Sequence, residues 1–208
     1  MSKTEVTVEM SDTKRRLLDA AVQLMLRRGF TATTVDEICA EADLTKGSFF
    51  HYFKSKDEIG EAALEHYFAR QREKFAQAPF NGVADPLERL HGLLDFIGQA
   101  FNCGERAQCC LLGNFTQELA LTHPRIRASC DDKLTKFAGV VETMLREAKT
   151  KHGSHAKFDP KSVATLFVSL MQGSMLLAKA RQDKSVLAEN LEHFRGYVDG
   201  LLAKGGRH

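Results

Sequence analysis

The chain has 208 residues, 43% of them hydrophobic and 27% charged, which allows one large domain or a small domain followed by a larger one. The charge content argues against a membrane protein, and we see no apolar run close to the roughly 20 residues that span a bilayer. A net charge of +2 excludes a protein that binds nucleic acid over its whole surface. Five cysteines without regular spacing fit a reducing compartment.

The first 56 residues predict a small helical domain. Residues 1–10 form an arm that we expect to be disordered, and they lack the apolar region of a signal peptide, which predicts a cytoplasmic location. A helix follows from Ser11 or Asp12 to about Arg28, where Gly29 can end it.

Two short helices separated by a tight turn follow this first helix. Thr34 and Glu37 form a capping box at the start of a helix of about two turns. Thr45 can cap a second helix that ends at about Phe53, and we expect Leu44 to be buried in the turn between them. This arrangement predicts a helix-turn-helix.

The second of these helices has the composition of a helix that contacts DNA. Gly47 costs about 1 kcal/mol relative to alanine in a helix, but its missing side chain lets a phosphate approach the backbone. Lys56, beside the N-terminus of the next helix, marks a second anion site. Residues 1–56 hold nine Lys or Arg against eight Asp or Glu, so we expect few phosphate contacts per subunit and a need for dimerisation.

Three segments carry a resemblance to a known family: TVDEI from Thr34, LTKGSFFHYF from Leu44 and KSKDEI from Lys54. Together they resemble the DNA-binding domain of the TetR family of bacterial transcriptional regulators. The family usually has tyrosine where this chain has Phe50, and that hydroxyl commonly meets a phosphate, so one backbone contact is in question. The resemblance and the pattern together give these candidate DNA-binding residues: Thr34, Thr45, Lys46, Gly47, Ser48, Phe50, His51, Tyr52 and Lys56.

The rest of the chain predicts a larger helical domain, over residues 57–208, for effector sensing and dimerisation. Periodic apolar residues, proline starts and polar breaks give six helices, over residues 57–78, 85–102, 110–121, 123–151, 159–183 and 186–203. No stretch has the pattern of a strand, so the fold class is all-α with about nine helices in total. The helix over residues 57–78 connects the two domains and could carry motion between them.

The last two helices carry more apolar residues than one side of a monomer could cover. Packed against a second copy they would form a four-helix interface, as TetR-like proteins do. We therefore expect a homodimer that binds a palindromic operator on double-stranded DNA, with a monomeric core as the alternative.

A cysteine-containing segment, CCLLGN from Cys109, resembles a segment of TetR-type regulators that respond to electrophiles. The resemblance implies that Cys110 reacts with the inducer and that Lys179 assists it, while Cys109 stands where that branch usually has glycine. A thiolate at a helix N-terminus would add to electrophiles or be oxidised reversibly to a sulfenic acid. The alternative, that Cys110 is a small buried core residue, remains equally open. The candidate effector-sensing residues are Cys110, Lys179, Cys109, Asn114, Phe115, Phe137 and Phe167.

Other interpretations of the larger domain remain open. Its aromatic and methionine residues could line a noncovalent pocket for an apolar ligand, although such residues are more often ordinary core. An enzyme with Cys110 as nucleophile lacks a matching His–Asp or His–Asn arrangement and any cofactor fingerprint, so we expect neither enzyme activity nor a cofactor. A metal site would use residues whose spacing matches no common zinc pattern, namely Cys103, Cys109, Cys110, His123 and Cys130. A helical module that binds protein rather than DNA would not explain Gly47.

Overall fold

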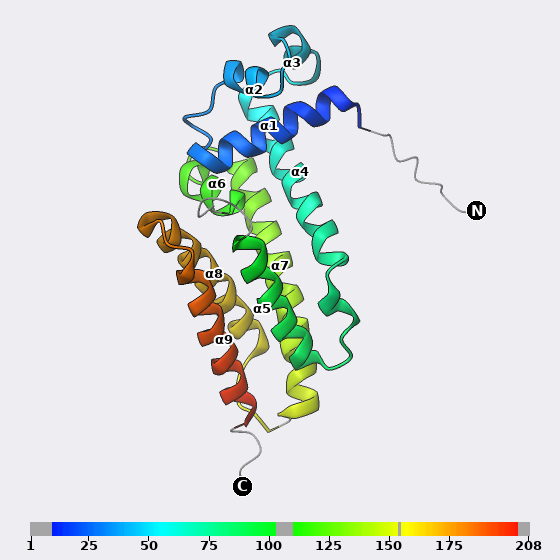
Figure 1. Cartoon of the computed structure of the whole chain (residues 1–208), viewed down its shortest axis with the longest axis vertical. Helices are drawn as coiled ribbons and strands as arrows, with labels where there is room; N and C mark the ends of the chain where they lie inside the picture. The colour runs from blue at the N-terminus through cyan, green and yellow to red at the C-terminus, as the bar shows by residue number, and fades with distance from the viewer. Residues whose placement is uncertain (1–9, 103–109, 154, 204–208) are drawn as a thin grey trace, which may run out of the picture. The chain divides into compact units, whose positions relative to one another are not determined.

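A computed structural model describes residues 10–102, 110–153 and 155–203. In these ranges the chain forms nine α-helices and one short 3₁₀ helix, with no strand, which confirms the all-α prediction (Figure 1). The elements are α1 Asp12–Arg28, α2 Val35–Glu41, α3 Lys46–Tyr52, α4 Lys56–Ala76, η1 Pro79–Gly82, α5 Pro86–Asn102, α6 Leu111–Leu119, α7 Pro124–His152, α8 Pro160–Arg181 and α9 Ser185–Ala203. The long helices end within two residues of their predicted ends. Residues 1–9 of the arm predicted at residues 1–10, and residues 103–109, lie outside the described ranges.

The chain divides into two compact units within α4, after Ala69. The domain boundary predicted from the sequence follows residue 56, which is the first residue of that helix. One continuous helix therefore belongs to both units.

The first unit is a three-helix domain with the start of α4 as its fourth side. Ser11 caps α1 through a hydrogen bond from the Lys14 amide, and Gly29 ends α1 with a φ of 86°, a conformation that glycine adopts without strain. Phe30, which follows Gly29, is buried. A methyl group at Gly60 would stand 2.6 Å from the Phe30 ring, so the close contact of α4 with that ring requires glycine.

The turn between α2 and α3 is built by Asp43 rather than by a glycine. Asp43 has a φ of 51°, and the Leu44 amide donates to the Cys39 carbonyl at 2.9 Å, which closes the turn. Leu44 is only half-buried, which corrects the prediction that the turn hides it completely. The left-handed residue, not a buried leucine, reverses the chain here.

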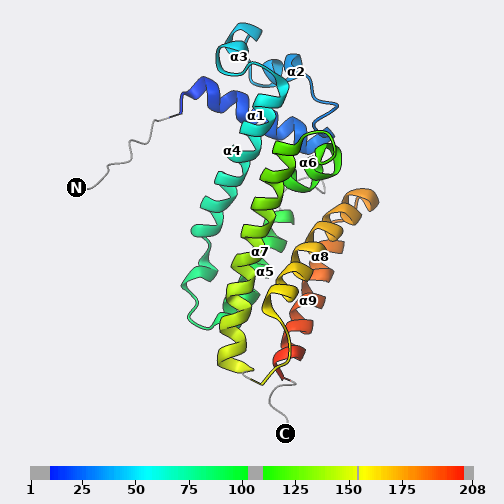
Figure 2. The ribbon, with the colours of Figure 1, turned by 180° about the vertical axis from the view of Figure 1, so that it is seen from behind.

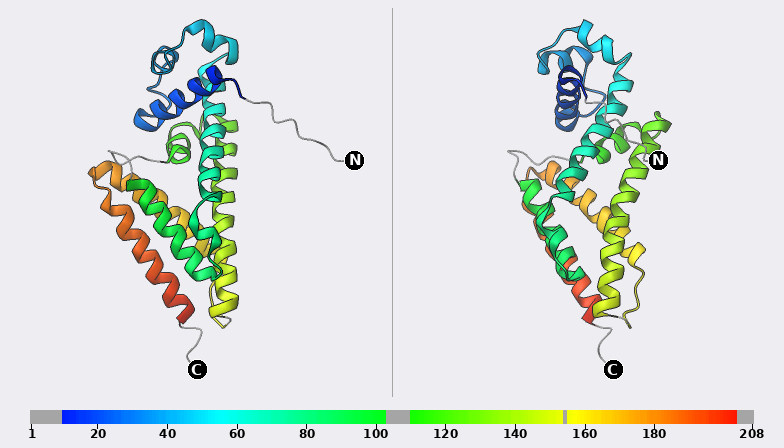
Figure 3. Two further views of the ribbon diagram at one scale, coloured as in Figure 1. Left: turned by 45° about the vertical axis from the view of Figure 1, so that its right-hand side comes forward. Right: turned by 90° about the vertical axis from the view of Figure 1, so that its right-hand side faces the viewer.

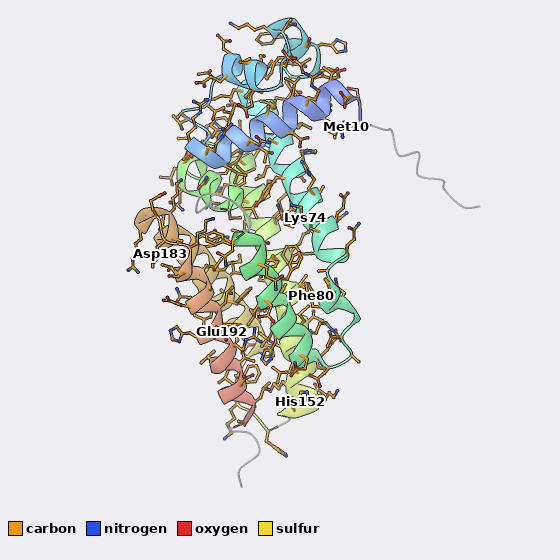
Figure 4. All side chains as sticks on the ribbon, viewed as in Figure 1. Met10, Lys74, Phe80, His152, Asp183 and Glu192 are labelled. Atoms are coloured by element: carbon orange, nitrogen blue, oxygen red, sulfur yellow. The ribbon has the colours of Figure 1, made fainter. Side chains whose placement is uncertain are left out.

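The second unit is a bundle in which α5, α7, α8 and α9 lie side by side, with α6 packed on α7 (Figures 2 and 3). Helices α8 and α9 run antiparallel and are joined by a short turn at Asp183, which is labelled in Figure 4. The core of this unit contains a row of neighbouring phenyl rings with centroids 4.9–6.1 Å apart, formed by Phe80, Phe96, Phe75, Phe137, Phe167 and Phe194.

One carboxylate ties the start of α5 to the end of α7. Asp85 accepts the amides of Leu87 and Glu88, which caps α5. The same carboxylate contacts Lys151 Nζ at 2.9 Å and His152 Nε2 at 2.7 Å, and His152 marks the end of α7 in Figure 4. The hydrogen bond from Lys151 is the main reason that the pKa of Asp85 lies far below its usual range.

Helix α8 is long and apolar enough to cross a membrane by length and composition alone, which corrects the expectation that no such segment exists. Only 33% of its most apolar 18-residue window is buried within the chain. Large apolar side chains on α8 and α9 are 42–47% exposed, namely Leu166, Leu176, Leu177 and Tyr197. These residues form the apolar face of α8 and α9.

Candidate functional site

Helix α3 is anchored to the first unit by aromatic side chains. Thr45 caps its N-terminus by accepting the Ser48 amide at 3.1 Å. Phe49 is fully buried, and its ring centroid lies 5.8 Å from that of Phe53. This inward side fixes which α3 residues point outward.

The outward side of α3 presents aromatic and polar groups. Phe50 is 56% exposed and contacts the edge of the Phe49 ring. His51 is exposed, with its ring 4.7 Å from the Tyr52 ring. The Tyr52 hydroxyl is held by Ser11 Oγ at 2.9 Å, which fixes the end of α3 against the start of α1.

The free protein does not need glycine at Gly47. A methyl group there would meet only Thr45 Oγ1, at an ordinary contact distance of 3.5 Å, and Gly47 does not have a positive φ. Gly47 is also exposed. Neither crowding nor backbone conformation within the chain therefore explains this glycine, whereas the close approach of another molecule would.

The two predicted phosphate-binding lysines already have partners inside the unit. Lys46 Nζ lies 2.8 Å from Asp36, and that hydrogen bond raises the pKa of Lys46. Both side chains are more than 60% exposed, so a phosphate could replace the carboxylate. Lys56 Nζ donates to the carbonyls of Phe30 and Thr31 at 3.2 and 3.3 Å and lies over the Phe30 ring, so it helps to hold the α1–α2 loop.

Three residues cap the two ends of α2. Thr34 and Glu37 form the predicted capping box, with the Thr34 amide 2.9 Å from Glu37 Oε2. At the other end, the Arg16 guanidinium donates to the carbonyls of Ala42 and Asp43 at 2.6 and 3.1 Å. This role of Arg16 has no signal in the local sequence, because its partners lie 26 and 27 residues away.

The second candidate site lies at the N-terminus of α6. Cys110 is the N-cap residue, it is half-buried, and its side chain makes no capping hydrogen bond. The other described cysteines, Cys39 and Cys130, are buried, and burial raises the pKa of each thiol. Cys110 is therefore the described cysteine best placed to react.

The side chain of Gln172, on α8, reaches the first turn of α6. A methyl group at Gly113 would stand 2.5 Å from Gln172 Oε1 and 4.0 Å from Cys110 Cβ, so the carboxamide and the cysteine lie on the same side of α6. Gln172 Nε2 is shielded from solvent and has no hydrogen-bond partner. Cys130 lies on the adjacent face of α7, where it contacts the Thr116 hydroxyl and interacts with Cys110 and the buried Lys133.

Comparison with known proteins identifies the family. Residues 17–63 match the bacterial regulatory proteins of the tetR family, and residues 86–194 match the tetracyclin repressor-like C-terminal domain. The chain belongs to the TetR family. The helix-turn-helix is thus a DNA-binding element of a bacterial transcriptional regulator, and the protein is not an enzyme.

Relatives and solved structures of the TetR family extend over nearly the whole chain. The transcriptional repressor NemR of Escherichia coli is 25% identical over 90% of this chain and 94% of its own length. A crystal structure of NemR in its reduced form has a TM-score of 0.75 at 26% identity, covering 89% of this chain and 96% of NemR. A TetR regulatory protein from Rhodobacter sphaeroides has a TM-score of 0.82 at 28% identity, covering 89% and 98%.

Not all of the predicted effector residues of this TetR-family chain come together. Lys179 lies two turns beyond Gln172 on α8, about 10 Å along the axis, and none of the contacts described here joins it to Cys110. Asn114 and Phe115 are buried on α6, whereas Phe137 and Phe167 belong to the ring row of the core. Cys109 lies outside the described residues. Within the described ranges, no group of three His, Cys, Asp or Glu side chains could hold a metal ion.

Proposed function

We propose that this chain is a homodimeric repressor that binds a palindromic operator through α3 and leaves it when an inducer reacts with Cys110. Among its relatives, NemR is named as a transcriptional repressor. The observation that carries DNA recognition is Gly47, an exposed helix glycine that the free protein does not need. As a bacterial transcription regulator, the protein acts in the cytoplasm, where the chromosome lies.

The outward side of α3 supports binding in the major groove. Gly47 admits a phosphate, Lys46 can exchange Asp36 for one, and Phe50 offers an apolar surface to a thymine methyl group. His51 and Tyr52 lie on the same short helix, while Thr34 and Thr45 place polar groups at the starts of α2 and α3. Lys56 supports this surface indirectly, because its ammonium group donates to the carbonyls of Phe30 and Thr31 in the α1–α2 loop.

Dimerisation is supported by the apolar face of α8 and α9. Four large side chains on these helices are more than 40% exposed in one chain, and exposed apolar patches commonly mark interfaces. A twofold axis through this face would present two copies of α3 to half-sites about 34–36 Å apart.

Release from DNA would begin at α6. Leu111, Leu112 and Phe115 are buried against the rest of the unit, so an adduct on Cys110 would force the start of α6 to repack. Helix α4 is common to both units and gives such a change a continuous path to the helix-turn-helix. The adduct would shift the dimer toward a conformation with poorly spaced copies of α3.

The DNA-binding part of the proposal is tested by fluorescence anisotropy with duplexes from the DNA that flanks the protein's own gene. We expect a palindromic sequence to bind one dimer. If the dimer neutralises about four phosphates, affinity should fall about 100-fold when monovalent salt is raised fourfold. Equal affinity for all fragments, or no salt dependence, would contradict it.

The thiol part is tested by adding an electrophile to the protein–operator complex. Wild type and Cys130→Ser should release DNA, whereas Cys110→Ser should bind normally and no longer respond. Cys130→Ser is the matched control because it removes the neighbouring thiol. If Cys110→Ser responds like wild type, the effector binds noncovalently, and the partly buried aromatic residues beside the core become the candidate pocket, namely Phe96, Phe101 and Phe137.

A further inference from the structure

Three arginines of α1 contact α2 or the turn that follows it, and they do so in two different ways. Arg27 Nη2 lies 2.8 Å from the carboxylate of Glu41. Arg28 Nη1 lies 3.0 Å from the carboxylate of Glu37. Exposed pairs between two side chains contribute little to stability. Arg16 differs from both, because it donates to main-chain carbonyls in the turn between α2 and α3.

The carbonyls that Arg16 binds lie where the chain reverses direction. Helix α2 ends at Glu41, and the last carbonyls of a helix have no partner within it. The Arg16 guanidinium supplies a partner at 2.6 Å from the Ala42 oxygen and at 3.1 Å from the Asp43 oxygen. Hydrogen bonds from a charged donor are roughly twice as strong as neutral ones. One side chain of α1 therefore holds two consecutive carbonyls of the turn.

The backbone of Asp43 requires support of this kind. Its φ of 51° is left-handed, a conformation that residues other than glycine adopt at a cost and keep only where surrounding contacts hold it. The carboxylate of Asp43 also lies 3.8 Å from the Arg16 guanidinium. Helix α3 begins at Lys46, three residues later, so the backbone angles of Asp43 set the direction in which α3 leaves α2.

Helix α1 also contacts the opposite end of α3. Tyr52 is the last residue of α3, and its hydroxyl accepts a hydrogen bond of 2.9 Å from Ser11, the N-cap residue of α1. Between these two ends, the buried Phe49 ring fixes how deeply α3 sits in the unit. The direction of the α3 axis then depends on its two ends, and Arg16 holds the end nearest to Gly47.

We propose that Arg16 is a positioning residue for operator recognition, which fixes the direction of α3 and does not itself contact DNA. This inference rests on the proposed function, because it requires α3 to bind an operator. A tilted α3 would lose its contacts with base edges, whereas the attraction between positive side chains and phosphates does not depend on sequence. Removal of the guanidinium should therefore weaken binding to the operator more than binding to random DNA.

The experiment measures two affinities of the full-length protein by fluorescence anisotropy. One duplex is the tightest-binding fragment from the DNA that flanks the protein's own gene, and the other has the same base composition in scrambled order. In Arg16→Met, the ratio of the two affinities should fall at least about 10-fold, which corresponds to about one lost base contact. Affinity for the scrambled duplex should stay within about twofold. Arg16→Lys keeps a charged donor and should recover part of the ratio.

The matched control is Arg27→Met. It removes the same charge from the same helix and also breaks a contact between α1 and α2, but that contact involves a side chain of α2 and not the turn. The ratio of the two affinities should stay within about twofold of wild type. If Arg27→Met lowers the ratio as much as Arg16→Met does, the effect comes from charge or general packing, and the positioning role is wrong.

The salt dependence of operator binding separates positioning from direct contact. If Arg16 does not touch DNA, the slope of log affinity against log salt should be the same in Arg16→Met and wild type. A slope smaller by about 0.9 for each Arg16 lost would show that the guanidinium neutralises a phosphate, which contradicts the inference. Circular dichroism at the assay temperature shows whether each variant is folded.

The remaining outcomes distinguish the inference from the function on which it rests. An equal loss of affinity for both duplexes would mean that Arg16 merely stabilises the first unit. An unchanged ratio would mean that the turn keeps its geometry without Arg16. Either result overturns the role of Arg16 and leaves operator binding through α3 standing. If the wild-type protein itself does not distinguish the two duplexes, both proposals are wrong.

Discussion

Gly47 is the residue on which the proposed DNA contact of α3 depends. Its surroundings would accept a methyl group at ordinary contact distance, and its backbone does not require glycine. Selection for stability alone would favour alanine, because alanine stabilises a helix by up to about 1 kcal/mol relative to glycine. The residue is best explained by the molecule that approaches it.

We predict that Gly47→Ala leaves the melting temperature unchanged or raises it, and weakens operator binding by at least 10-fold. The added methyl group would stand where a DNA phosphate has to approach the backbone. Gly139→Ala is the matched control, since Gly139 lies in the middle of α7 and a methyl group there meets nothing within 4 Å. Melting curves and anisotropy titrations check both variants, and undiminished DNA binding by Gly47→Ala would refute the assignment.

Phe50 allows a second prediction at the level of one side chain. Phe50→Tyr adds a hydroxyl to a residue that is 56% exposed, so the free protein should keep its stability. If the hydroxyl meets a phosphate, each subunit gains about 1 kcal/mol and the dimer binds the operator roughly 10-fold or more tightly. Because the new group is neutral, the salt dependence should not change. A steeper salt dependence would show that the docking itself had moved.

Among the secondary-structure elements, the helices were predictable and several of their contacts were not. Apolar periodicity, the Thr34 capping box and the proline starts specify where helices form, because these signals act within a few residues. Lys56 was expected at a phosphate, yet its ammonium group binds carbonyls 25 and 26 residues earlier in the chain. Gln172 carried no local signal either, since its contact with Gly113 joins two different helices. Contacts between distant residues of this kind require the three-dimensional structure.

The connection between α5 and α7 makes a prediction about pH. Asp85 is paired with Lys151 and His152, and its pKa is depressed in the folded protein, mainly by Lys151. A carboxyl group with a depressed pKa stabilises the fold above its unfolded pKa of about 4, and this contribution is lost as the pH falls further. Asp85→Asn should therefore melt at a lower temperature than wild type at pH 7, and the difference should shrink below about pH 4.

The comparison of two substitutions separates the ion pairs from the helix cap. Asparagine can still accept the amides of Leu87 and Glu88, whereas alanine cannot, so Asp85→Ala should be less stable than Asp85→Asn at every pH. Melting temperatures measured between pH 3 and pH 7 check this. A difference between wild type and Asp85→Asn that stays constant over that range would show that the ion pairs contribute nothing.

At the scale of the whole molecule, we predict that the protein binds DNA as a homodimer. A glutamate at Leu176, which is 47% exposed on α8, should leave the monomer folded but introduce a charge into the apolar face of α8 and α9. We expect Leu176→Glu to be monomeric by light scattering and to bind the operator at least 100-fold more weakly, because each half-site is then bound alone. Leu121→Glu is a suitable control, since this leucine is 97% exposed and outside α8 and α9. A Leu176→Glu dimer would place the interface elsewhere.

The ion pair between Lys46 and Asp36 has a consequence for how quickly the protein finds its target on a chromosome. Lys46 must break its ion pair with Asp36, 2.8 Å away, before it can bind any phosphate. DNA of arbitrary sequence therefore meets a surface whose positive charge is already partly neutralised. The residence time on non-operator DNA should therefore be short. Only a site that also fits Gly47 and Phe50 should hold the protein long enough to block a polymerase. By weakening the binding to non-operator DNA, Asp36 would shorten the search for the operator.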